Sequence, residues 1–186
     1  MNFRAEKLGL DGCYVAHLLP SHDERGSFLK IYHSVAFADF LPNFVPREMY
    51  VTHSAKQVIR GMHFQLPPFS HSKVVVCLSG SVLDVLLDLR PGPNFGNFSS
   101  VVLSGQRENA VLLPRGVAHG FFAIEDSVLI YLVDSIYNEK NDKGIRWDSF
   151  GFAWPTLNPV VSERDQLHSD LKNFIAPKNW DEDYSS

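Results

Sequence analysis

The sequence predicts an all-β fold in which two sheets close into a barrel, with a few short helices. Aromatic residues make up 12% of the chain, and clusters of β-branched and aromatic residues recur between short breaks of Gly, Pro, Ser and Asn. This pattern is typical of many short strands, and the chain offers enough of them for a double-sheet barrel. Its 186 residues, 45% of them hydrophobic, suffice to bury one substantial core. We therefore expect one domain, residues 1–186.

The strand candidates follow one another along the chain. Lys73–Leu78 and Val82–Leu89 are separated by Ser79-Gly80-Ser81, which predicts a tight hairpin in which Gly80 supplies a positive φ. Both of these strands are too apolar to have one face in water. The other candidates are Cys13–Leu19, Ser27–Tyr32, Glu48–Thr52, Val58–Phe64, Phe98–Leu103, Asn109–Leu113, Gly120–Ala123 and Leu129–Val133.

Helix signals are few. His33–Asp39 could form a short helix, and Ser162 is a candidate N-cap because Ser-Glu-Arg-Asp resembles a capping box with Asp in place of Glu. The stretch from Asn173 onward contains the acidic run Asp181–Asp183, and we expect it to be a helical or irregular tail at the surface.

Charge and cysteine content exclude several classes of protein. A formal net charge of −4 argues against nucleic acid or an anionic membrane as the partner, because both require clustered Lys and Arg. Cys13 and Cys77 are the only cysteines, too few for a disulfide framework or a Cys-rich zinc site. The N-terminus lacks the apolar segment of a secretory signal, and the apolar run Val82–Leu89 is too short to span a bilayer. We expect a cytoplasmic protein.

A histidine in one predicted strand is a candidate functional residue. Strict alternation along the strand places Arg60, Met62 and Phe64 on one face, and His63 and Gln65 on the other. His63 and Gln65 would then share the barrel interior. A lone histidine in such a position is more often a hydrogen-bonded core residue than a catalyst, so its context decides its interpretation.

That context begins with residues 114–119, which read Pro-Arg-Gly-Val-Ala-His and deliver His119 into a new strand. This Pro-x-Gly-x-x-His pattern resembles the second motif of the cupins, whose fold is a double-stranded β-helix or jelly-roll barrel. The first cupin motif supplies His-x-His, and here His63-Phe64-Gln65 has glutamine in place of the second imidazole. No carboxylate follows His63 within ten residues, so a transition metal would lack ligands. We expect no metal and no cofactor.

Several segments together resemble one branch of the cupins, the dTDP-4-keto-6-deoxyglucose (dTDP-4-dehydrorhamnose) 3,5-epimerases, from about Cys13 to Asp165. The resemblance implies an isomerase that epimerises a nucleotide-linked 4-keto-6-deoxyhexose in deoxysugar and polysaccharide (O-antigen) biosynthesis. It also implies a homodimer with an N-terminal strand extension. The segments are Asp-Glu-Arg-Gly-Ser-Phe (23–28), Arg-Gly-Met-His-Phe-Gln-Leu-Pro-Pro (60–68), Ser-Gly-Ser-Val-Leu-Asp (79–84), Leu-Pro-Arg-Gly-Val-Ala-His-Gly-Phe (113–121), Ile-Tyr-Leu (130–132), Gly-Ile-Arg-Trp (144–147), Trp-Pro (154–155) and Ser-Glu-Arg-Asp (162–165).

The resemblance assigns each role that the chemistry requires. Epimerisation beside a ketone needs a base on one face, stabilisation of the enolate and an acid on the other face. By similarity His63 is the base, Asp165 holds its ring, Lys73 stabilises the enolate oxygen and Tyr131 returns the proton. From the residues alone, Lys73 could equally be a strand-end lysine whose ammonium reaches solvent. Tyr131 and Tyr137 could equally pack in the core.

The substrate contacts are likewise implied by the resemblance. Arg25 and Arg60 match positions that hold the diphosphate, for which guanidinium groups are suited, although a surface ion pair is the commoner role of either alone. His119 would orient the sugar, and Phe28 would line the nucleotide pocket. The full set expected to contact the substrate is Arg25, Phe28, Arg60, Gln65, His119, Glu48 and Tyr137.

Departures from the family pattern leave more than one function open. Glu48 and Tyr50 stand where the family has a Gln-x-Asn pair that helps to bind the nucleotide. This change suggests a CDP-linked 3,6-dideoxy-4-hexulose 5-epimerase of the ascarylose type as an alternative. A metal-dependent cupin isomerase or dioxygenase would instead use His63, His119 and either His71 or Gln65 as ligands. A non-catalytic sugar-binding cupin would share the same barrel and the same arginines.

Overall fold

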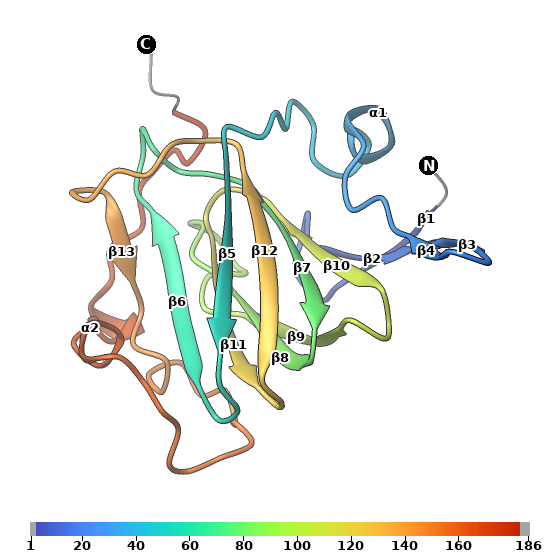
Figure 1. Cartoon of the computed structure of the whole chain (residues 1–186). Helices are drawn as coiled ribbons and strands as arrows, with labels where there is room; N and C mark the ends of the chain where they lie inside the picture. Colours follow the sequence, from blue (N-terminus) through green and yellow to red (C-terminus); the bar gives the residue numbers. More distant parts are fainter. Residues whose placement is uncertain (1–2, 183–186) are drawn as a thin grey trace.

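The computed structural model describes residues 3–182, so the expected domain ends at 1 and 186, and Asp183 of the acidic run, lie outside the described residues. Two sheets pack face to face (Figure 1). In sheet order, the six-stranded sheet contains β1 (Phe3–Lys7), β2 (Tyr14–Leu18), β10 (Asn109–Leu113), β7 (Lys73–Ser79), β12 (Ser127–Val133) and β5 (Glu48–Ser54). The five-stranded sheet contains β13 (Asp142–Gly144), β6 (Ile59–Gln65), β11 (Val117–Ala123), β8 (Ser81–Asp88) and β9 (Phe98–Ser104). The all-β, double-sheet barrel predicted from the sequence is confirmed.

The turn at Gly80 differs from its prediction. Gly80 has φ 76°, as expected, but β7 and β8 belong to different sheets and are not paired, so the turn is a corner and not a hairpin. A Cβ at this position would lie 2.1 Å from the carbonyl oxygen of Asp126, so only glycine fits. Local spacing suggests pairing of neighbouring strands, whereas barrel closure sends each strand to another partner. Both strands are largely buried, as expected.

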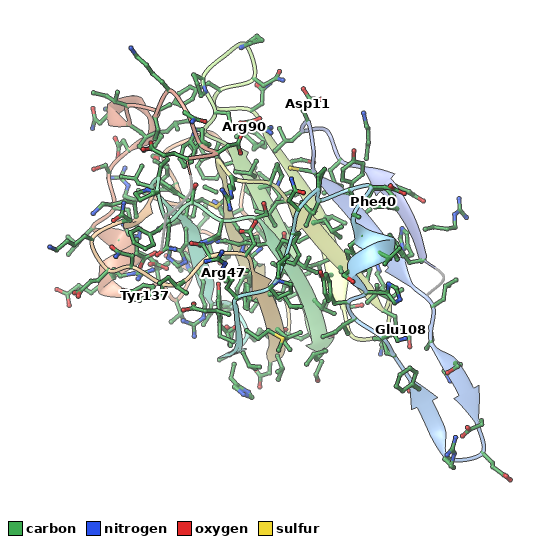
Figure 2. The ribbon with its side chains drawn as sticks, turned by 90° about the horizontal axis from the view of Figure 1, so that it is seen from above. Asp11, Phe40, Arg47, Arg90, Glu108 and Tyr137 are labelled. Atoms are coloured by element: carbon green, nitrogen blue, oxygen red, sulfur yellow. The ribbon has the colours of Figure 1, made fainter. Side chains whose placement is uncertain are left out.

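The strand predicted over Ser27–Tyr32 is largely wrong. Only Gly26–Phe28 forms a strand, β4, which pairs with β3 (Ser21–Asp23) in a separate two-stranded hairpin. This hairpin projects away from the barrel (Figures 1 and 2). The apolar residues that follow it, from Leu29 to Tyr32, pack beneath α1 instead of extending a sheet.

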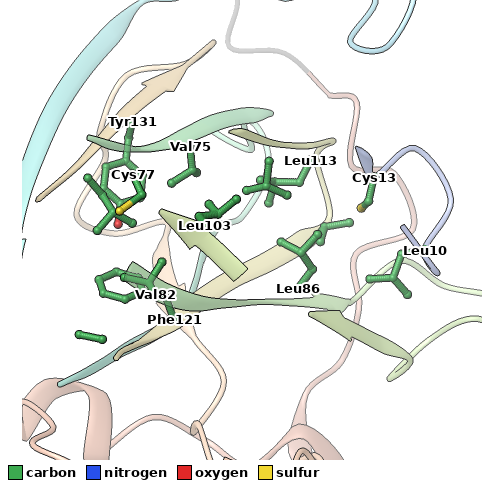
Figure 3. Packing of buried hydrophobic residues seen from close by; sticks show 14 residues of the cluster. Leu10, Cys13, Val75, Cys77, Val82, Leu86, Leu103, Leu113, Phe121 and Tyr131 are labelled. Atoms are coloured by element: carbon green, nitrogen blue, oxygen red, sulfur yellow. The ribbon is translucent and has the colours of Figure 1, made fainter. Parts of the chain in front are cut away.

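Three apolar layers hold the barrel together. The layer between the sheets contains Val75 and Tyr131 from one sheet facing Val82 and Phe121 from the other (Figure 3). A second layer covers the outer face of the six-stranded sheet, and a third covers the five-stranded sheet with C-terminal residues such as Trp180. Because β7 and β8 are buried on both faces over most of their length, these two strands read as nearly continuous apolar runs.

The helices are short. α1 (Ser34–Phe37) begins after His33, and α2 (Glu163–Gln166) begins after Ser162, whose hydroxyl accepts a hydrogen bond from the Asp165 backbone N–H at 3.2 Å. The predicted N-cap at Ser162 is therefore confirmed. A single 3₁₀ turn, η1, follows at Leu171–Asn173. No helix within residues 3–182 has the length and apolar character needed to cross a membrane.

Candidate active site

A bulge in β6 sets which side chains face the barrel interior. His63 pairs with His119 of β11, and Arg60 pairs with Phe121, so three steps along β6 match two along β11. The extra residue reverses the alternation, and Arg60 lies on the same face as His63. The predicted placement of Arg60 on the opposite face, with Met62, is thus wrong, because the strand is not regular at this point.

The Arg60 side chain reaches across the barrel to the edge strand β5. Its Nε donates to the Ser54 hydroxyl at 2.9 Å, and its terminal nitrogen donates to the His53 carbonyl at 3.2 Å. The bulge requires glycine, because a Cβ at Gly61 would lie 2.4 Å from the Gly120 Cα. The close approach of the two backbones therefore positions Arg60.

His63 and Asp165 form a hydrogen-bonded pair, although they are far apart in the sequence. His63 Nε2 lies 2.7 Å from Asp165 Oδ1, and the Gly61 backbone N–H donates to Asp165 Oδ2 at 3.1 Å. Burial would raise the pKa of Asp165, but the nearby His168 and the hydrogen bonds from His63 and Gly61 lower it well below its usual range. Burial lowers the pKa of His63, and Asp165 offsets only part of that shift. The pair therefore consists of a neutral imidazole and a carboxylate.

His168 is a third member of this group, and sequence reasoning missed it. Its Nε2 lies 3.5 Å from Asp165 Oδ1, and its ring centroid is 5.8 Å from that of His63 with the planes at 79°. The available signal was its position three residues after Asp165 at the end of a short helix, where such residues share a face. No motif marked it.

Metal binding can be tested against these contacts. Within residues 3–182, the one set of at least three metal-ligating side chains with close donor atoms is His63, Asp165 and His168, all within 4.8 Å, and it includes neither His119 nor His71. Two ligands of a tetrahedral zinc lie about 3.3 Å apart. The 2.7 Å contact between His63 and Asp165 is instead a hydrogen bond. Among the described residues, the alternative ligand set of His63, His119 and His71 is therefore not brought together.

Lys73 opens β7 and is 4% exposed. Its Nζ donates to the His63 carbonyl oxygen at 3.1 Å. Burial lowers its pKa to about 8, against the opposing influence of Asp142 and Asp84. The ammonium therefore lies inside the barrel next to the backbone of His63, not in solvent.

Tyr131 lies deeper in the barrel. Its ring stacks on Tyr50 at a centroid distance of 4.7 Å, and its hydroxyl lies 3.5 Å from Thr52 Oγ1. The His119 ring approaches it edge-on at 5.9 Å, and His119 Nε2 contacts Asp84 Oδ2 at 2.7 Å. Burial raises the pKa of Tyr131 well above its usual range, so its phenol keeps its proton.

A cavity of about 340 Å³ opens beside these groups. Its lining includes five of the predicted residues together with Tyr50, but not Tyr131, which lies behind Tyr50. The lining residues are Glu48, Tyr50, His63, Phe64, Gln65, His71, Lys73, Val133, Ser135, Tyr137, Asp142 and Arg164. A concave site on which polar and ionisable groups converge between aromatic and apolar side chains is typical of a small-molecule site.

Gln65 and Glu48 shape the mouth of this cavity. Gln65 Nε2 donates to the carbonyls of Phe69 and Ile136, at 2.9 and 3.0 Å, and its Oε1 accepts from the Asn138 backbone at 2.6 Å. Glu48 accepts from the Tyr137 backbone N–H at 2.9 Å. Both side chains thus fasten the segment that carries the exposed Tyr137 ring.

Arg25 and Phe28 are not brought to this cavity. They lie on the projecting β3–β4 hairpin, at the opposite end of the molecule from Tyr137 (Figure 2). Arg25 pairs there with Asp23, and the Phe28 side chain is exposed. These two predicted residues therefore cannot contact a ligand in the cavity of their own chain without a large movement of the hairpin.

Comparison with known proteins agrees with this geometry. The sequence model described as dTDP-4-dehydrorhamnose 3,5-epimerase matches residues 7–173. The dTDP-4-dehydrorhamnose 3,5-epimerase of Shigella flexneri is 34% identical over 161 residues, covering 82% of this chain and 89% of that protein. The crystal structure of a 4-keto-6-deoxy sugar epimerase from the novobiocin gene cluster of Streptomyces spheroides superposes with a TM-score of 0.87, 33% identity and coverage of 92% and 89%. A 3'-monoepimerase of Streptomyces bikiniensis in complex with dTDP-quinovose superposes with a TM-score of 0.83, 27% identity and coverage of 89% and 86%.

Proposed function

Because this chain belongs to the dTDP-4-dehydrorhamnose 3,5-epimerase family, we propose that it epimerises a dTDP-linked 4-keto-6-deoxyhexose in deoxysugar biosynthesis. The observation that carries the proposal is the 2.7 Å hydrogen bond between His63 and Asp165, with the Lys73 ammonium lining the same cavity. A neutral imidazole accepts a proton, and an ammonium stabilises the negative charge that develops on the ketone oxygen.

The proton steps follow from these positions. His63 Nε2 is engaged by Asp165, which leaves Nδ1 to take the proton from the carbon beside the ketone. The electron pair of that C–H bond moves to the ketone oxygen, and Lys73 stabilises the resulting enolate. Tyr131 then donates its phenol proton to the opposite face of the carbon, and both groups regain their starting protonation by exchange with water. The His119–Asp84 pair beside Tyr131 would orient the sugar.

Tyr50 is an obstacle to this scheme unless the substrate moves it. Its ring stacks on Tyr131 and separates the phenol from the cavity. We propose that the sugar displaces the exposed part of Tyr50 when it binds, and that Arg60, Glu48, Gln65 and Tyr137 line its path. The stack then opens only when substrate is present.

We also propose that the enzyme is a homodimer in which Arg25 and Phe28 complete the site of the partner. Three features support this. The β3–β4 hairpin projects from the barrel with Phe28 65% exposed. Within residues 3–182, the edge strand β5 pairs only with β12, and it exposes Met49 (66%) and Val51 (48%). Unpaired, apolar strand edges favour association.

A mixing experiment tests the shared site. Arg25→Ala and His63→Ala enzymes should each be nearly inactive, and co-refolding them should restore about a quarter of the wild-type sites by random pairing. The matched control is a co-refolded mixture of the His63→Ala and Lys73→Met enzymes. His63 and Lys73 belong to the same site of the same chain. Every site in this mixture therefore lacks either the base or the cation, and no activity should return. No recovery in the mixture of Arg25→Ala and His63→Ala would contradict the shared site.

Both sheets contribute to one cavity, so we further propose that residues 1–186 act as a single domain.

We propose a cytoplasmic location, because Cys13 and Cys77 are buried free thiols that suit a reducing compartment.

The experiment that tests the reaction uses dTDP- and CDP-linked 4-keto-6-deoxy sugars in deuterated water, with product stereochemistry read by NMR. We expect deuterium at C3, C5 or both on the dTDP substrate, and no incorporation with His63→Ala. Efficient turnover of only the CDP-linked 3,6-dideoxy sugar would favour the ascarylose-type epimerase suggested by Glu48 and Tyr50. Undiminished incorporation by His63→Ala would overturn the assignment of the base.

A further inference from the structure

We propose that His168 is a positioning residue: it shares the Asp165 carboxylate with His63 and so sets the pH range over which His63 can take a proton. This inference rests on the proposed role of His63 as the base. It adds a second imidazole to the site, one that none of the motifs in the sequence indicates.

The contacts that carry the inference converge on one oxygen atom. Asp165 Oδ1 lies 2.7 Å from His63 Nε2 and 3.5 Å from His168 Nε2. The His168 Nε2 atom is buried and makes no hydrogen bond within the described part of the chain. A buried N–H without an acceptor costs about 1 to 3 kcal/mol, and the Asp165 carboxylate at 3.5 Å is the acceptor that we infer it engages after a small movement of either side chain.

The position of the His168 ring is fixed by a glycine. Gly144 of β13 pairs with His63 of β6, and a Cβ at residue 144 would lie 2.3 Å from atoms of the His168 ring. The bridge between Ile145 and Ser169 holds the adjacent backbone. The ring therefore occupies the space that a side chain at 144 would fill, directly beside the His63–Asp165 pair.

The direction of the effect follows from charge. A carboxylate oxygen that accepts a second donor attracts the proton of His63 less strongly, so His168 makes the His63 imidazolium less stable. If His168 is protonated, its positive charge acts in the same direction. Removing the His168 N–H should therefore raise the pKa of His63 and confine the neutral base to higher pH.

Other charged groups face His63 and stay in place when residue 168 is changed. Arg164 lies 3.4 Å from Asp165 Oδ1 and 2.8 Å from Asp142 on β13. Lys73 on β7 donates to the His63 carbonyl. On β11, the paired residue His119 is bonded to Asp84. A change at residue 168 thus alters one contact of Asp165 and leaves this charged surrounding intact.

Two variants separate hydrogen bonding from packing. His168→Phe keeps an aromatic ring beside Gly144 but removes the N–H, whereas His168→Gln keeps an N–H donor without an imidazole. We expect His168→Phe to move the acid limb of the kcat/KM profile upward by about half a pH unit, which is about a threefold loss of rate below that limb. His168→Gln should stay closer to wild type. The control His17→Phe, on β2 beside Glu6, should leave the profile unchanged.

The titration of the His63 ring, followed by NMR in the same full-length variants, supplies a readout that does not depend on catalysis. An upward shift of the His63 pKa in His168→Phe supports the inference, whether or not His63 is the base. The assignment of His63 as the base is tested separately, and it fails if His63→Ala still incorporates deuterium. A His63 pKa in His168→Phe within about 0.2 pH unit of wild type would overturn the inference. If His168→Phe does not fold, His168→Met, which also lacks the N–H, takes its place: an upward shift of the His63 pKa supports the donor role, and a value within about 0.2 pH unit of wild type contradicts it.

Discussion

Replacement of Asp165 by asparagine should disable the base by reversing its tautomer. Asp165 Oδ2 accepts the buried Gly61 N–H at 3.1 Å, and Oδ1 faces His63 Nε2 at 2.7 Å. In Asp165→Asn the amide oxygen must remain on the Gly61 N–H, because a buried donor without an acceptor is costly. The amide NH₂ then faces His63, which can accept that hydrogen bond only if its own proton moves to Nδ1. The nitrogen that should take the substrate proton is then already protonated.

The size of the loss can be estimated from this geometry. General-base catalysis contributes about 10²- to 10⁴-fold to a rate, and in Asp165→Asn both the tautomer and the facing charge are lost. We expect kcat to fall by about 10³-fold. The remaining activity should have its acid limb at lower pH, by about one to two units, because an anion that raised the pKa of His63 is gone.

The assay measures deuterium incorporation and product formation by NMR across pH 5 to 9, and a fall of kcat by about 10³-fold is readily resolved. Asp148→Asn is the matched control, since Asp148 is an exposed aspartate paired with Arg146 and should behave as wild type. A kcat for Asp165→Asn within about fivefold of wild type would show that Asp165 does not set the tautomer of His63.

Three further predictions concern the acid, the cation and the barrel corner. Tyr131→Phe should retain deuterium exchange into recovered substrate but lose about 10²-fold or more of the epimerised product, and full epimerisation would refute the acid role. The wild-type rate should fall as pH rises through about 8, where Lys73 loses its proton. In Lys73→Met this alkaline limb should vanish and kcat should drop by about 10²-fold. An alkaline limb that persists in Lys73→Met would belong to another group. Gly80→Ala should lower the free energy of unfolding, measured by urea denaturation, by about 2 to 3 kcal/mol, because φ is positive and Asp126 blocks a Cβ. Gly92 also has a positive φ but has open space around it, so Gly92→Ala should lower the free energy of unfolding by less. Equal losses in the two variants would contradict the role of the steric contact.

The sequence could predict the strands because burial on both faces makes them apolar, as in Val82–Leu89. It could not predict their pairing at Gly80, because a tight turn has the same residues whether it joins two strands of one sheet or turns a corner between two sheets. The apolar residues of Ser27–Tyr32 predict a strand, yet most of them pack beneath α1. Apolar content alone does not separate these two outcomes.

For the site, alternation placed His63 inside, but the bulge beside it placed Arg60 there as well. A single inserted residue cannot be seen in a pattern of period two. The contact between Asp165 and His63 came only from the family resemblance, since more than a hundred residues separate them. The only sequence signal for His168 was its position three residues after Asp165, because its contact also depends on the absence of a side chain at Gly144.

The hydrogen bond from Lys73 to the backbone of His63 has a consequence for how the substrate specificity of such an enzyme can change. Lys73 belongs to the six-stranded sheet and His63 to the five-stranded sheet, so the Lys73 side chain crosses from one sheet to the other. The spacing between the cation and the base thus depends on how the two sheets pack and not on the loops at the cavity. Residues at the cavity mouth, such as Glu48 and Tyr137, can therefore diverge to accept another nucleotide while the chemical step keeps its geometry.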